Sequence, residues 1–199
     1  TTPSSASLKV GAELALKNQN GQLQVDRGES YRAMVREMKN VEDSDYQIPP
    51  QLLKILREYQ KTGYRWLRTL AHLRFGGILA DDMGLGKTIQ SITYVLWLRE
   101  EFARKNKSKK KVVIPPVLIV CPKSVLDVWA GETEKFAPGV RVLVIRSKDQ
   151  ANLEDIKKNY DMVVVNYAQL RVCGETLNQI KWLTVILDEG QQIKNPDSK

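Results

Sequence analysis

The chain has 199 residues, of which 42% are hydrophobic and 27% are charged, a balance typical of one globular domain with a sizeable core. No apolar run approaches the roughly 20 residues of a membrane span, and residues 1–7 are too polar for a secretory signal, so we expect an intracellular protein. The two cysteines, Cys121 and Cys173, and the single histidine, His72, cannot assemble a zinc site. Any bound metal is therefore expected to have oxygen ligands.

The net charge of +8 permits binding to a polyanion but does not demonstrate it. More than half of this excess comes from one short stretch with five lysines: Lys105, Lys107, Lys109, Lys110 and Lys111. Such a run is typical of a solvated loop between a helix and a strand, and contact with DNA is the alternative.

The first 48 residues differ in pattern from the rest of the chain. Their predicted elements are a hairpin of residues 14–16 and 23–25 around the turn signal Asn20-Gly21, and a helix at residues 31–39 capped by Ser30. Pro49 and Pro50 then mark a boundary, because proline cannot continue a preceding helix. We expect residues 1–48 to be an extension from an upstream region and residues 49–199 to be the main domain.

In the main domain, short apolar stretches alternate with longer amphipathic ones. The predicted strands are residues 77–80, 117–121, 140–145, 162–165 and 184–187, and the predicted helices between them are residues 88–104, 124–136 and 149–158. Strands that are apolar on both faces indicate a parallel sheet with helices on both sides. We therefore predict a doubly wound α/β fold, with its ligand at the carboxyl ends of the strands.

A glycine-containing loop follows the first of these predicted strands and precedes a long predicted helix. Its sequence is Asp81-Asp82-Met83-Gly84-Leu85-Gly86-Lys87-Thr88. The glycines let backbone N–H groups turn towards an anion, and the helix N-terminus adds partial positive charge. We expect this loop to bind ATP, with Lys87 at the β- and γ-phosphates and Thr88 on Mg²⁺. The strict phosphate-loop pattern has glycine where this chain has Asp81, and an ordinary strand-to-helix turn is the alternative.

Two adjacent carboxylates, Asp188 and Glu189, directly follow the last predicted strand. Asp188 is expected to hold Mg²⁺ through water, and Glu189 to orient and deprotonate the water that attacks the γ-phosphate. On its own, such a pair usually belongs to a solvated loop. A phosphate loop predicted at the end of another strand of the same sheet favours a catalytic role instead. Lys87, Asp188 and Glu189 are therefore the predicted catalytic residues, and hydrolysis is favoured over phosphoryl transfer.

These motifs together resemble the Swi/Snf-type branch of superfamily-two helicases. The stretches that carry the resemblance are residues 56–67, Leu-Arg-Glu-Tyr-Gln-Lys-Thr-Gly-Tyr-Arg-Trp-Leu, and residues 76–88, in which aspartate at position 81 is the family's usual variant. The resemblance covers roughly residues 49–199 and implies a RecA-like ATP-binding lobe of a double-stranded DNA translocase. It also implies that Gln60 contacts adenine and that Gln191 couples nucleotide to DNA. The Asp-Glu-Gly-Gln sequence is close to a bacterial form of its motif, which favours a bacterial protein.

Further positions are similar to the motifs with which this family contacts DNA. By this resemblance, the residues expected to face DNA phosphates are Pro122, Lys123, Ser124, Asn166 and Tyr167. A motor that moves along any sequence must hold the backbone rather than the bases, which suits such side chains. Trp129 follows the first of these motifs, where core packing is favoured and DNA contact is the alternative.

The sequence ends shortly after Asp188, before the family's next motif. We expect a second lobe of the same protein to supply the arginines that complete the site, so that the chain alone binds nucleotide but hydrolyses it poorly. The expected location is the cytoplasm, at the nucleoid, for a bacterial protein and the nucleus for a eukaryotic one. An RNA-directed helicase lobe and a non-catalytic scaffold are the alternative functions, and the sequence does not reveal a protein cargo.

Overall fold

In the computed structural model, the described residues are 14–19, 22–27, 29, 32, 36, 47–82, 84–107 and 112–193. Met83, Lys109 to Lys111 and most of the predicted helix at residues 31–39 lie outside them. The chain divides into two compact units, one of residues 1–46 and 61–80 and the other of residues 47–60 and 81–199.

The first unit contains a two-stranded antiparallel sheet. Strands β1 (Leu14–Gln19) and β2 (Gln22–Arg27) pair from Leu14 opposite Arg27 to Gln19 opposite Gln22. This is the strand pairing that the sequence pattern predicts, although the turn residues between the strands lie outside the described part. The assignment of residues 1–48 to a separate extension stays a prediction.

Helix α4 (Glu58–His72) buries Tyr64 and Leu70. The chain then passes so close to this helix that a Cβ on Gly77 would lie 2.2 Å from the Leu70 Cδ1 atom and 2.9 Å from the Trp66 ring. The strand predicted at residues 77–80 is wrong, because these residues pair with no strand in the described part of the chain and Ile78 is 85% exposed. A short apolar run predicts burial, but a strand also needs a neighbouring strand to which it can hydrogen-bond.

The second unit is built on a four-stranded parallel sheet. Its strands, in sheet order, are β4 (Val142–Ile145), β5 (Met162–Asn166), β3 (Val117–Cys121) and β6 (Val185–Leu187). Every residue of β3 and β5 is buried, as expected for central strands covered on both faces.

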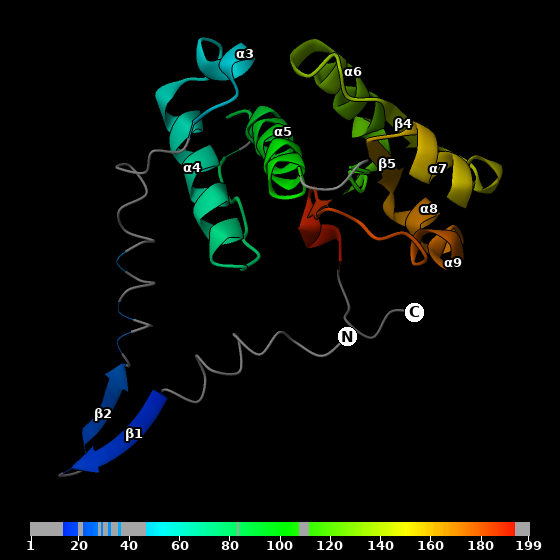
Figure 1. Cartoon of the computed structure of the whole chain (residues 1–199). Helices are drawn as coiled ribbons and strands as arrows, with labels where there is room; N and C mark the ends of the chain where they lie inside the picture. The colour runs from blue at the N-terminus through cyan, green and yellow to red at the C-terminus, as the bar shows by residue number, and fades with distance from the viewer. Residues whose placement is uncertain are drawn as a thin grey trace. The chain divides into compact units, whose positions relative to one another are not determined.

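Alternate side chains of these central strands enter two different apolar clusters. Val117 and Ile119 pack with α5 (Lys87–Lys105) and α6 (Leu126–Phe136), whereas Leu118 and Val120 face the cluster of α7 (Leu153–Asn159), α8 (Tyr167–Val172) and α9 (Gly174–Leu177). The sheet therefore carries helices on both faces (Figure 1). This arrangement confirms the predicted doubly wound α/β class.

Several short elements complete this unit. They are α3 (Pro50–Leu53) and the 3-10 turns η2 (Lys123–Val125), η3 (Lys148–Gln150) and η4 (Gly190–Gln192). The helix predicted from residue 149 begins only at Leu153, because a capping box of Ser147 and Gln150 starts the separate turn η3 and Asn152 caps α7 by accepting a bond from Asp155 N. No helix of the described residues is long and apolar enough to cross a bilayer.

A buried carboxylate joins α5 to the amino ends of β4 and β5. Asp161 is 8% exposed and accepts hydrogen bonds from Arg99 Nη2 at 2.7 Å, Arg141 Nε at 2.9 Å and Arg141 N at 3.0 Å. Burial alone would raise the pKa of Asp161, but the hydrogen bonds from Arg141 and the charges of Arg99 and Arg141 outweigh burial and lower it.

Replacing Asp161 with asparagine is expected to reduce the free energy of unfolding of the chain by about 2–3 kcal/mol at neutral pH, because Arg99 loses its partner. The folded-state pKa lies below the ordinary value of 3.8, so the contribution is complete above that value and disappears as the pH falls below it. Urea denaturation at pH 7 and at about pH 3 measures both effects. Asp127, whose ion pair with Arg146 is exposed, is the control, and Asp127→Asn should cost less than about 1 kcal/mol. Equal losses for the two variants would contradict the role of Asp161.

Candidate nucleotide-binding site

The predicted phosphate loop lies directly before α5, with Lys87 as the first residue of that helix. Gly84 and Gly86 have φ angles of 83° and 76°, in the left-handed region that glycine tolerates best. A Cβ on Gly86 would also lie 2.4 Å from Gln60 Nε2. Both the backbone angle and this close approach therefore require glycine at position 86.

Gln60 braces the loop from the start of α4. Its Nε2 donates to the Leu85 carbonyl at 3.1 Å, its Oε1 accepts from Arg57 N at 3.0 Å, and the residue is 8% exposed. The structure thus places Gln60 against the backbone of the phosphate loop. Its predicted contact with adenine stays a prediction.

Asp81, the departure from the strict loop pattern, ties the two ends of the loop together. Its Oδ2 accepts from Gln90 Nε2 at 3.0 Å, and its backbone carbonyl accepts from Lys87 Nζ at 2.7 Å. Lys87 Nζ also donates to the Asp82 carbonyl at 3.1 Å. Gln90 is fully buried on α5 and was not singled out from the sequence, although its position one turn after Lys87 is the signal that places it beside the loop.

Asp81→Ala is expected to weaken nucleotide binding about fivefold to tenfold, because a loop freed from Gln90 must be ordered when the phosphates bind. The measurement is a titration of the protein with a fluorescent ADP analogue in Mg²⁺. Asp155 offers a matched control, since its carboxylate also accepts one bond from a side-chain amide, that of Asn159 on α7. Unchanged affinity in Asp81→Ala, or an equal loss in Asp155→Ala, would refute this role for Asp81.

The two predicted catalytic carboxylates lie at the carboxyl end of β6. Asp188 N donates to the Val120 carbonyl at 2.8 Å, which continues the pairing of β6 with β3 by one residue. Glu189 follows with a φ angle of 53°, a left-handed conformation that is uncommon outside glycine. Its carboxylate accepts a hydrogen bond from Gln191 Nε2, so the structure links two of the predicted site residues directly.

Two aromatic side chains hold Asp188 from other elements. Trp129 Nε1 donates to Asp188 Oδ2 at 2.9 Å, and the Tyr167 hydroxyl donates to the Asp188 carbonyl at 2.7 Å. Trp129 is 2% exposed within the α5–α6 cluster, which confirms core packing over DNA contact for this residue. Its bond to Asp188 was not anticipated, because the two residues are 59 positions apart in the sequence.

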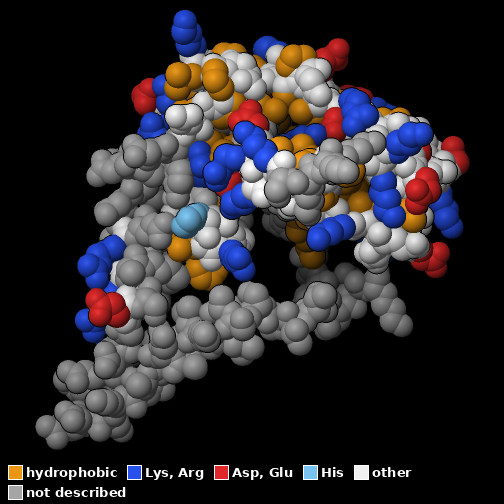
Figure 2. All heavy atoms as spheres, viewed as in Figure 1, with side chains coloured by type: hydrophobic (Ala, Val, Ile, Leu, Met, Phe, Trp, Pro, Cys, Tyr) orange, Lys and Arg blue, Asp and Glu red, His pale blue; other side chains and the backbone are white. Residues whose placement is uncertain are grey.

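Four of the five predicted DNA-facing residues line one pocket of about 680 Å³ beside α8. The lining residues are Pro122, Lys123, Asn166, Tyr167, Ala168, Arg171 and Val172, and Ser124 is not among them. Asn166 Oδ1 also caps α8 by accepting from Gln169 N at 2.9 Å. With Lys123 and Arg171 in its wall, the pocket has the charge to receive an anion, and we call it the basic pocket. Basic side chains are also spread over the face shown in Figure 2, with carboxylates among them.

The residues of the phosphate loop and β6 suit Mg-ATP, although no hydrogen bond or ion pair of the described residues joins the loop to Asp188 or Glu189. Within the described part, Lys87 has no carboxylate partner and contacts only backbone carbonyls, so its charge is available to phosphate. No group of three or more His, Cys, Asp or Glu side chains that could hold a metal occurs among the described residues. A metal bound here would take most of its ligands from water and phosphate oxygens, as Mg²⁺ commonly does.

Comparison with known proteins gives the family. The model of the SNF2-related domain matches residues 59–199. The chain belongs to the SNF2-related family. It is 38% identical over 180 residues to the TATA-binding protein-associated factor mot1 of Aspergillus fumigatus, covering 87% of this chain and 9% of that protein. Against the putative ATP-dependent helicase/translocase YwqA of Bacillus subtilis it is 35% identical, covering 89% of this chain and 19% of that protein.

The structural comparison agrees with this assignment. The Sulfolobus solfataricus SWI2/SNF2 ATPase core, solved in complex with double-stranded DNA, matches with a TM-score of 0.57 and 36% identity, over 78% of this chain and 29% of that one. The predicted Swi/Snf-type resemblance and RecA-like lobe are confirmed. The chain spans less than a fifth of the length of either of these two relatives, one from a fungus and one from a bacterium.

Proposed function

We propose that this SNF2-related chain is the ATP-binding lobe of a double-stranded DNA translocase, with residues 49–199 forming the lobe. The observation that carries the proposal is the pairing of a phosphate loop at the start of α5 with the adjacent carboxylates Asp188 and Glu189 at the end of β6. The double-stranded DNA in the related Sulfolobus solfataricus core supports DNA as the polymer.

In this proposal each side chain has one task at the nucleotide. Lys87 leaves the Asp81 and Asp82 carbonyls to neutralise the β- and γ-phosphates, and backbone N–H groups of the loop are proposed to surround these phosphates. Thr88 and Asp188 would hold Mg²⁺, which when bound offsets negative charge on the phosphates. Glu189 accepts the proton of the attacking water, and its bond from Gln191 orients the carboxylate for that purpose. Gln60 is proposed to reach adenine from its place beside the loop.

The basic pocket is the proposed contact for the nucleic-acid backbone. Lys123 and Arg171 supply positive charge there, the Asn166 side-chain amide can donate to phosphate without reading sequence, and the Tyr167 ring lines the same wall. Pro122 shapes the same wall, and Ser124 extends the proposed contact along η2.

A second lobe is proposed to complete the site with arginines that stabilise the transferring phosphate. We therefore expect the chain alone to bind Mg-ADP, seen as a higher melting temperature, but to hydrolyse ATP far more slowly than the whole protein. Rates measured on both under saturating DNA test this expectation. Equal rates would show that this lobe needs no partner for hydrolysis.

The deciding experiment measures ATP hydrolysis by the whole protein without nucleic acid and with duplex DNA, single-stranded DNA or RNA, using Lys87→Ala as the blank. Strong stimulation by duplex DNA, absent from the blank, is the expected result. Stimulation by RNA alone would replace the proposal with an RNA-directed helicase. No hydrolysis above the blank would instead indicate a scaffold that binds without catalysis.

A further inference from the structure

Asp188 is held at two points, its carboxylate and its backbone carbonyl. The carboxylate accepts from Trp129 Nε1 on α6 at 2.9 Å, and the carbonyl accepts from the Tyr167 hydroxyl on α8 at 2.7 Å. The two donors come from helices on opposite faces of the sheet. Together they restrict both the rotation of the side chain and the path of the backbone after β6.

The indole of Trp129 is a rigid donor. It is 2% exposed and packs in the cluster of α5, α6, β3 and β5, so its ring cannot turn away from Asp188 without disturbing the core. A hydrogen bond to a carboxylate in such surroundings is shorter and stronger than one between neutral groups.

Tyr167 connects Asp188 to the basic pocket. It lines that pocket with Lys123 and Arg171, while its hydroxyl bonds the Asp188 carbonyl. An occupant that shifts this ring therefore also shifts the backbone that carries Asp188.

We propose that Trp129 and Tyr167 are positioning residues for Asp188: Trp129 fixes the carboxylate for Mg²⁺, and Tyr167 transmits occupation of the basic pocket by a nucleic-acid backbone to the same residue. This inference rests on the proposed function, since it takes Asp188 as the residue that holds the metal. It adds two side chains that touch neither nucleotide nor metal, and it gives a route by which DNA binding alters the ATP site.

The two roles predict different losses. Trp129→Phe keeps an aromatic ring but removes the donor, and the Mg²⁺ concentration that half-saturates nucleotide binding should rise about tenfold, as expected when the hydrogen-bond partner of a metal ligand is lost. Tyr167→Phe removes only the hydroxyl, and the ratio of hydrolysis rates with and without saturating duplex DNA should fall about fivefold or more.

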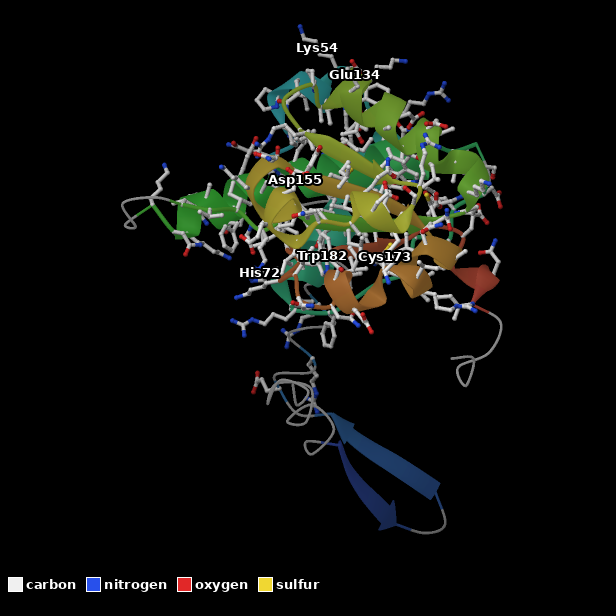
Figure 3. The ribbon with its side chains drawn as sticks, turned by 90° about the vertical axis from the view of Figure 1, so that its right-hand side faces the viewer. Lys54, His72, Glu134, Asp155, Cys173 and Trp182 are labelled. Carbon is white, nitrogen blue, oxygen red and sulfur yellow. The ribbon has the colours of Figure 1, made fainter. Side chains whose placement is uncertain are left out.

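Matched controls come from the same unit. Trp182 Nε1 donates to the Leu177 carbonyl at 3.0 Å, beside Cys173 in the α8–α9 cluster (Figure 3), so Trp182→Phe removes an indole hydrogen bond far from β6's carboxyl end. Tyr94, half-buried on α5 with its ring centroid 5.9 Å from that of Trp97, is the control for Tyr167, because Tyr94→Phe removes a phenol hydroxyl that does not bond Asp188. Neither control should change the Mg²⁺ dependence or the stimulation by DNA.

The experiment uses the whole protein and two readouts: binding of a fluorescent ADP analogue across a Mg²⁺ titration, and hydrolysis with and without saturating duplex DNA. Asp188→Asn is the reference variant. If Asp188→Asn keeps the normal Mg²⁺ dependence, the proposed ATP site is itself wrong. If Asp188→Asn loses that dependence while Trp129→Phe and Tyr167→Phe match their controls, only the positioning proposal is overturned.

A folding defect is separated from a positioning effect by a second substitution. Replacement of Trp129 with benzothienylalanine, in which sulfur takes the place of Nε1–H, keeps the ring volume and removes only the donor. Melting temperatures in EDTA should match the unmodified protein, while the tenfold rise in required Mg²⁺ persists. A normal Mg²⁺ dependence in this variant would overturn the role of Trp129 whatever Trp129→Phe does.

Discussion

Replacing Lys87 with alanine should lower ATP hydrolysis by the whole protein at least about 100-fold and weaken its binding to Mg-nucleotide. The physical reason lies in the contacts of Lys87 Nζ, which are two loop carbonyls at 2.7 and 3.1 Å. Carbonyl dipoles offset the positive charge of an ammonium group only in part. The Lys87 ammonium is therefore held at the loop but is not neutralised by an ion pair. Within the described part Lys87 pairs with no carboxylate, so the phosphates of a bound nucleotide would be the first negatively charged groups to pair with it.

Lys105 is the matched control for this prediction. It lies at the other end of α5, its side chain is 67% exposed, and it pairs with Glu101 at 3.1 Å. An exposed ion pair of this kind contributes little, so Lys105→Ala should retain both hydrolysis and nucleotide binding. Loss of hydrolysis in Lys87→Ala, with normal hydrolysis and nucleotide binding in Lys105→Ala, would support the role of the loop in binding phosphate. Normal hydrolysis in Lys87→Ala would mean that ATP is bound elsewhere.

The α/β class and the left-handed turns of the candidate loop could be predicted because they depend on local signals. Apolar runs at β3 and β5 are buried on both faces, and Gly84 and Gly86 have the positive φ angles that a phosphate-binding turn requires. The strand expected at residues 77–80 failed for the opposite reason. A strand depends on a partner distant in the sequence, and no periodicity in four apolar residues reports whether that partner is present.

The contacts that hold Asp188 could not be predicted for the same reason. Trp129 lies 59 positions before Asp188 and Tyr167 lies 21 before it, and only the parallel order of β5, β3 and β6 brings them together. Core packing of Trp129 was readable from its type, since large aromatic residues are usually buried. The hydrogen-bond partner of the Trp129 N–H could not be predicted, because it depends on where the neighbouring strand β6 ends.

Glu189→Gln should separate chemistry from binding. Glutamine keeps the size of the side chain and can still meet Gln191, but it cannot take a proton from water, and loss of a general base lowers the rate by about 10² to 10⁴. Mg-nucleotide affinity should stay within about twofold, because Asp188 and Lys87 remain. The measurement is single-turnover hydrolysis of ATP beside equilibrium binding of a fluorescent ADP analogue.

The control for Glu189→Gln is the same substitution at Glu134, an exposed residue on α6, the helix that carries Trp129 (Figure 3). Glu134→Gln should hydrolyse ATP at the normal rate, because an exposed carboxylate on a helix has no path to the attacking water. If Glu189→Gln lost nucleotide affinity and rate together, Glu189 would have to hold the metal beside Asp188. If it lost neither, the left-handed turn at Glu189 would serve only to aim Asp188, and another group would have to accept the proton.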